Sequence, residues 1–101
     1  MYSCLYYTAI TDLDASLSDI MTKKHLYGPA LEWAGQALVV RAHGYGIMHD
    51  KTADSHFSLG ILYRLLGLYE KSRQELYISK FLMQNLSLPN KKSYRIKFML
   101  L

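Results

Sequence analysis

An internal repeat constrains the fold of this 101-residue chain more than any other feature of its sequence. When residues 17–40 are aligned with residues 59–82, an offset of 42, small residues mostly meet small residues and large apolar residues meet large apolar ones. Repeats of this length are typical of proteins in which one supersecondary unit stacks on the next. The aligned pairs include Leu17 with Leu59, Ile20 with Leu62, Leu26 with Leu68, Tyr27 with Tyr69, Ala30 with Ser72 and Val40 with Leu82.

The second half of the chain shows a helical hairpin most clearly. Residues 52–66 form the first predicted helix, because their apolar residues recur at helical spacing on two stripes. Asp50 is its predicted N-cap, and Gly67 is predicted to end it in the left-handed conformation. A second helix is predicted from Tyr69 to Leu86, and the short connection makes the two helices antiparallel. The two stripes of the first helix are Phe57, Ile61 and Leu65, and Leu59, Leu62, Tyr63 and Leu66. The predicted buried residues of the second helix are Leu76, Phe81, Leu82 and Met83.

The first half follows the same plan. A helix is predicted over residues 8–24, a turn over 25–28, and a second helix over 30–42, with Pro29 as the first helical residue. Gly44 and Gly46 then separate the two halves. The first helix carries the apolar residues Leu13, Leu17, Ile20 and Met21. The second has Ala30, Ala34 and Ala37 on one face, where their small size lets another helix approach closely.

The predicted fold class is therefore all-α, with two tandem antiparallel helical hairpins in an α-solenoid. We expect an N-terminal extension (1–9), a helical repeat domain (10–86, with repeats over 10–44 and 50–86) and a short basic C-terminal tail (87–101). The apolar content of 50% excludes a disordered chain, and one cysteine excludes an internal disulfide. No apolar run approaches the ~20 residues of a membrane-spanning helix.

Several residues of the second half also match a known repeat: the pair Leu59-Gly60, then Tyr63, Gly67 and Tyr69, and the small residue Ser72. This pattern resembles the tetratricopeptide repeat family. The period of 42, with His49 before the next helix, is similar to the longer repeats of kinesin light chains. The first half departs from the family pattern at Ser18, Met21 and His25, where the family favours Gly or Ala, Tyr and Gly.

The resemblance implies a non-enzymatic scaffold whose first helices line a concave groove that binds a peptide. Lys23 and Arg64 in that groove would favour a ligand with an acidic residue beside an aromatic one. The alternative is that Phe57, Ile61 and Leu65 are packing residues, covered by the tail or by a further repeat. The groove positions carried over are Asp12, Ala15, Asp19, Thr22 and Lys23 from the first repeat, and Asp54, Phe57, Ile61, Arg64 and Leu65 from the second.

The predicted function is a protein–protein interaction module in the cytoplasm, with the nucleus as an alternative. By resemblance it would link cargo or adaptors to microtubule transport, or receive substrates for a ubiquitin ligase. We also expect self-association through the open ends of a two-repeat array. A truncated isoform of a longer array, without a function of its own, is a further alternative.

The charge distribution indicates one alternative class of partner, and the spacing of the histidines and the cysteine indicates no metal site. From Leu76 onward there are five bases and no acid, so a basic tail that binds a membrane surface or nucleic acid is the alternative function, although no nucleic acid is expected. The four histidines and Cys4 have no metal-ligand spacing, so no metal, cofactor or catalytic residue is predicted.

Overall fold

The structure of the protein is a computed structural model, and it describes residues 3–86, with side chains from Thr11 onward. Four α-helices and no strand make up this part of the chain, which confirms the predicted all-α class. The basic tail predicted over 87–101 lies outside the described residues. The helices are α1 (Ser3–Lys23), α2 (Tyr27–Gly44), α3 (Asp50–Leu65) and α4 (Tyr69–Asn85).

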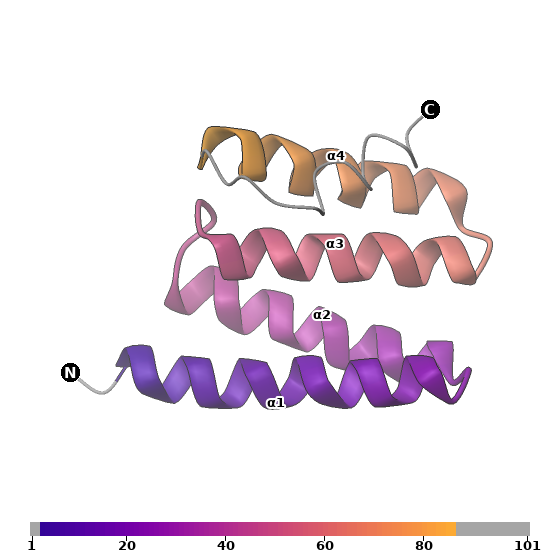
Figure 1. Ribbon diagram of the computed structural model, residues 1–101, viewed down its shortest axis with the longest axis horizontal. Helices are drawn as coiled ribbons and strands as arrows, with labels where there is room; N and C mark the ends of the chain where they lie inside the picture. The colour runs from indigo at the N-terminus through magenta and orange to yellow at the C-terminus, as the bar shows by residue number, and fades with distance from the viewer. Residues whose placement is uncertain (1–2, 87–101) are drawn as a thin grey trace.

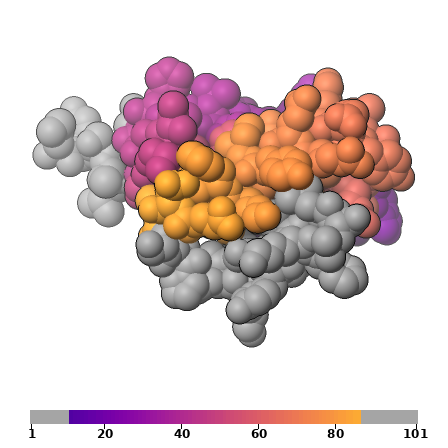
Figure 2. Space-filling model, turned by 90° about the horizontal axis from the view of Figure 1, so that it is seen from above, coloured from indigo at the N-terminus to yellow at the C-terminus, as the bar shows by residue number. Residues whose placement is uncertain are grey.

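The helices lie side by side in chain order, and each runs antiparallel to the one before it (Figure 1). α1 packs on α2, α2 on α3 and α3 on α4. α4, in orange, faces the viewer in the space-filling view, which is seen from above (Figure 2). None of the described helices is both long and apolar enough to cross a membrane.

The two hairpin turns have the same geometry. The residue with a positive φ is His25 (61°) in the first turn and Gly67 (81°) in the second, so the left-handed conformation predicted for Gly67 is confirmed. The two turns are therefore equivalent at the offset of 42 that the alignment predicts. Each is closed by the same pair of backbone hydrogen bonds: Leu26 N to Met21 O and His25 N to Thr22 O in the first, and Leu68 N to Tyr63 O and Gly67 N to Arg64 O in the second.

Small residues allow the helices of each hairpin and the two hairpins to approach closely. The three alanines predicted on one face of α2 are buried, and two of them form a cluster with Leu59 and Leu62 of α3. Between α3 and α4, a Cβ added to Gly60 would lie 2.7 Å from Leu76 Cγ. A second buried cluster completes the core and consists of Ala53, Phe57, Leu76, Leu82 and Met83.

Phe81, which was predicted to be buried, is exposed, and so are two of the large apolar residues of α1. Leu13 and Ile20 of α1 are 61% and 49% exposed, and Phe81 of α4 is 60% exposed. Among its described residues α1 buries Thr11, Asp14 and Ser18, whereas Leu17 and Met21 are only half-buried. Because the alanine face of α2 lets α1 approach closely, the space between the two helices decides which side chains fit there. Burial therefore does not follow from hydrophobicity alone.

Helix boundaries also differ from the predictions. α1 begins at Ser3, and α2 begins at Tyr27, so Pro29 lies within its first turn, where its missing N–H needs no helical partner. Asp50 is the first residue of α3, and its N-cap is His49. His49 has extended backbone angles, and its side chain accepts a hydrogen bond from the Lys51 amide at 3.1 Å.

Candidate binding groove between α1 and α3

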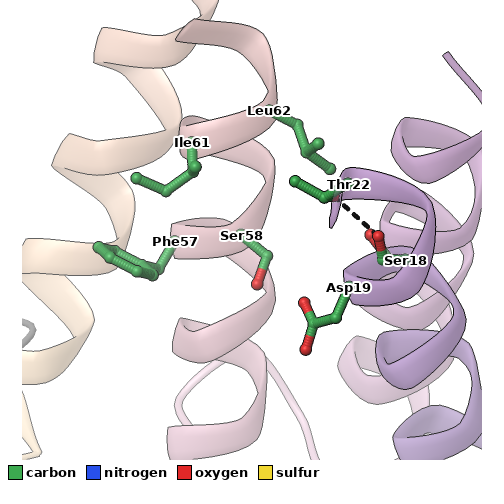
Figure 3. A pocket seen from close by; sticks show the side chains of 7 residues that line it. All are labelled: Ser18, Asp19, Thr22, Phe57, Ser58, Ile61 and Leu62. Atoms are coloured by element: carbon green, nitrogen blue, oxygen red, sulfur yellow. Dashed lines mark hydrogen bonds between the residues drawn. The ribbon is translucent and has the colours of Figure 1, made fainter. Parts of the chain in front are cut away.

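A pocket with a volume of about 180 Å³ lies between α1 and α3, the first helices of the two hairpins. It forms because these two helices are each packed on α2 and leave a space between them. The lining side chains, shown in Figure 3, are Ser18, Asp19 and Thr22 from α1, and Phe57, Ser58, Ile61 and Leu62 from α3.

The structure brings together four of the eight residues predicted to form the partner-binding groove. These four are Asp19, Thr22, Phe57 and Ile61. The other four do not line the pocket: Lys23, Asp54, Arg64 and Leu65. Of these, Lys23, Arg64 and Leu65 are exposed and lie near the ends of their helices.

Three further lining residues were not among the predicted groove residues. Ser18 was noted only as a departure from the family pattern, and Leu62 was placed on a different apolar stripe from Phe57 and Ile61. Ser18 lies four residues before Thr22, Ser58 lies four residues after Asp54, and Leu62 lies three residues before Leu65. Because residues three or four apart share a face of a helix, extending the predicted groove by one turn along each face would have found them.

The α3 wall of the pocket is apolar except for Ser58, and its apolar residues are packed into the core. Phe57 is only 7% exposed and belongs to the buried cluster between α3 and α4, and Ile61 packs against that cluster. Phe57 is thus a packing residue as well as a lining residue. Figure 3 shows both side chains on the side of α3 away from α1, whereas Leu62 and Ser58 face α1.

The α1 wall is polar, and its hydroxyl groups bind the backbone. The Ser18 hydroxyl donates to the Ala30 carbonyl oxygen at 2.9 Å, and the Thr22 hydroxyl donates to the Ser18 carbonyl oxygen at 2.8 Å. Asp19 is exposed, and its carboxylate points from α1 toward α3 (Figure 3). One pocket therefore combines an apolar wall with a wall that carries a negative charge.

The groove continues from this pocket into a smaller hollow over α2. Ser18 and Ser58 line both spaces, and Ala34 and Ala37 of α2 contribute to the second. Arg41 also lines the hollow, and its guanidinium group is buried. The groove thus spans both hairpins, with part of its floor formed by α2.

Arg41 joins three helices through a network of polar contacts. Its guanidinium donates to the Ser55 hydroxyl at 2.7 Å and forms an ion pair with Asp12 at 3.1 Å. Lys51 Nζ also lies 3.1 Å from the same Asp12 oxygen. Asp12, one of the expected groove positions, therefore holds α1 to α2 and α3.

In the described part of the chain, no group of three or more His, Cys, Asp or Glu residues is placed to hold a metal ion. No protein-family model, curated protein or solved structure matches this chain.

Proposed function

We propose that this chain is a non-enzymatic protein-interaction module of the tetratricopeptide type, and that it binds an extended segment of a partner protein in the groove between α1 and α3. The observation that carries the proposal is the pocket between these two helices, which has apolar and charged walls. Its volume of about 180 Å³ is below the ~300–1,000 Å³ of pockets that enclose a small molecule. It suits one side chain of a longer ligand.

The geometry of the hairpins supports the tetratricopeptide part of the proposal. Both hairpins have the same turn, and small residues lie where their helices cross, which is consistent with two copies of one helical unit stacked on each other. The proposed biological role follows from the resemblance in sequence: linkage of cargo or adaptors to microtubule transport, or substrate reception for a ubiquitin ligase, in the cytoplasm.

Selection from a displayed library of random nine-residue peptides tests the binding function. The purified full chain is the bait, with Ser58→Arg as the variant that fills the pocket and Ser16→Arg as the matched control. Ser16 is exposed on α1 and does not line the pocket. We expect peptides that bind the wild type and the control but lose binding to Ser58→Arg. Selected peptides that bind all three chains equally would contradict the proposal.

A basic tail that binds a membrane surface or nucleic acid is the alternative function, and the five bases after Leu76 favour it. Such binding is electrostatic, so it falls steeply as salt is raised. It would also survive Ser58→Arg, because the pocket takes no part. Binding to anionic vesicles or to a DNA duplex at two salt concentrations therefore separates the two functions.

Self-association through α1 belongs to the same proposal. Leu13 and Ile20 are exposed on α1, while the residues at the offset of 42, Ser55 and Leu62, are buried where α3 packs on α2. The outer face of α1 thus corresponds to the face that α3 buries against α2, but it stays exposed among the described residues. A second copy of the chain is the occupant that we propose for this face.

A further inference from the structure

Asp19 is the charged residue that lines the pocket, so the charge of the site is negative. Lys23 and Arg64, the two bases expected in the groove, do not line it. The Asp19 carboxylate forms no ion pair or hydrogen bond in the described part of the chain. Asp12, by contrast, is paired with both Arg41 and Lys51. The free carboxylate at the pocket is therefore available to a ligand.

The hydroxyl groups beside Asp19 make the α1 wall a surface of hydrogen-bond acceptors. A hydroxyl group has one proton to donate, and Ser18 and Thr22 each donate theirs to a backbone carbonyl. Both oxygens can then offer only lone pairs to a ligand, and an ionised carboxylate accepts only. This wall suits a ligand group that donates hydrogen bonds and accepts none.

The opposite wall supplies apolar contact from Leu62, which faces α1, while Ile61 and Phe57 line the pocket from the far side of α3 (Figure 3). Arginine has an apolar stem, which can lie on such a surface while its charged end stays beside polar groups. Its planar guanidinium carries five donors and no acceptor, and it binds a carboxylate through two parallel hydrogen bonds. Lysine offers a similar stem but binds as a point charge without this geometry.

We propose that the groove selects a peptide with a basic side chain, arginine above lysine, whose guanidinium binds Asp19 and whose stem contacts the α3 wall. This inference rests on the proposed peptide-binding function and names its ligand class. It replaces the expected acidic ligand, because an acidic side chain in the pocket would lie beside Asp19 and be repelled by it.

The test uses four blocked pentapeptides of the form acetyl-Gly-Ala-Xaa-Ala-Gly-amide, with arginine, citrulline, leucine or glutamate at the third position. Citrulline keeps the shape of arginine and removes the charge. Each peptide is titrated into the full, ¹⁵N-labelled chain at low salt, and the amide signals of Ser58 and Leu62 report occupancy of the pocket. We expect the arginine peptide to bind about tenfold more tightly than the citrulline peptide, and the glutamate peptide to bind most weakly.

Asp19→Asn removes the charge and keeps the size of the side chain. The arginine peptide should therefore bind this variant about tenfold more weakly than the wild type, with the affinity that the citrulline peptide has for the wild type. Glu32→Gln is the matched control, since Glu32 is exposed on α2, outside the pocket, and the change in net charge is the same. Equal loss in the two variants would overturn the role of Asp19. Tighter binding of the glutamate or leucine peptide in the pocket would overturn basic selectivity and leave peptide binding standing. If the displayed library also yields no groove-dependent peptide, the proposed function fails as well.

Discussion

The Ser18 hydroxyl donates a hydrogen bond of 2.9 Å to the carbonyl oxygen of Ala30, and this bond ties α1 to α2. The positions 42 residues later form the same contact in the opposite direction, because Ser72 of α4 donates to Gly60 of α3 at 2.7 Å. Each hairpin thus has one hydroxyl group at this crossing, on the first helix in one hairpin and on the second helix in the other. The two hairpins share a geometry although the residues that achieve it are exchanged between helices.

The crossing of α3 and α4 predicts that Gly60→Ala is destabilising. A Cβ at Gly60 would lie 2.7 Å from Leu76, which is buried and has little room to move. We expect the free energy of unfolding, measured by urea denaturation, to fall by ~1–3 kcal/mol. Gly35→Ala is the control: a Cβ there meets nothing within 4 Å, and alanine favours the helix by up to ~1 kcal/mol.

The first hairpin indicates how this loss can be relieved. Its residues at the positions of Gly60 and Leu76 are Ser18 and Ala34, so a larger residue on the first helix faces a smaller one on the second. Adding Leu76→Ala to Gly60→Ala should therefore cost less than the sum of the two single changes. Full additivity in the same urea measurements would contradict a direct contact between these two positions.

The first turn predicts a stabilising substitution. His25 has a φ of 61°, a conformation that costs a residue other than glycine ~1–2 kcal/mol. His25→Gly removes this cost but gives the unfolded chain more freedom, so we expect a net gain of about 0.5–1 kcal/mol in thermal or urea unfolding. His25→Ala is the control, because it removes the exposed contact of the ring with the Tyr27 hydroxyl and keeps the strain. A gain of the same size in both variants would argue against relief of strain.

The helices were predictable from the sequence because their signals are local. Apolar spacing and Gly67 placed the second hairpin, and the offset of 42 then placed the first. The inward face of α1 was not predictable in the same way. Its large apolar residues Leu13 and Ile20 face outward. The buried residues of α1 are instead Thr11, Asp14 and Ser18, because the packing against α2 decides which side chains fit. No pattern within α1 itself carries that information.

The candidate site was predictable only in part. The family pattern places Asp19 and Thr22 on the groove face of α1, and both line the pocket. It also places Lys23 and Arg64 on the groove face, but neither of these residues lines the pocket. The sign of the charge at the pocket depends on which face each side chain occupies, and one residue along a helix turns the side chain by about 100°.

The polar network between the hairpins predicts that Arg41→Met is destabilising. The Arg41 guanidinium is buried and contacts Asp12 and Ser55, so its loss leaves the buried hydroxyl with one fewer partner. Asp12 is 45% exposed and can be hydrated, so the expected loss is ~1–3 kcal/mol, below that for a fully buried ion pair. Urea denaturation measures this loss. Arg73→Met is the control, since Arg73 makes only an exposed ion pair with Glu70 and should change stability little.

The exposed face of α1 predicts how the chain self-associates. α2 has Leu31 and Leu38 packed against the cluster that joins it to α3, and α4 has Arg73 and Lys80 at the corresponding positions. The charged side chains of α4 oppose stacking on that face, so the α1 face is the one that we expect to pair, through Leu13 and Ile20 of two copies. Because each copy would present the same apolar face, the association should be dimeric and related by a two-fold axis.

Sedimentation equilibrium over a range of concentrations measures this association. Replacing both Leu13 and Ile20 by glutamine should shift the average mass toward the monomer, because the apolar area that a dimer would bury is lost. Phe81→Gln is the control, since Phe81 is equally exposed but lies on α4. A wild-type chain that stays monomeric at every concentration, or a Phe81→Gln chain that dissociates while the α1 variant does not, would show that α1 is not the pairing face.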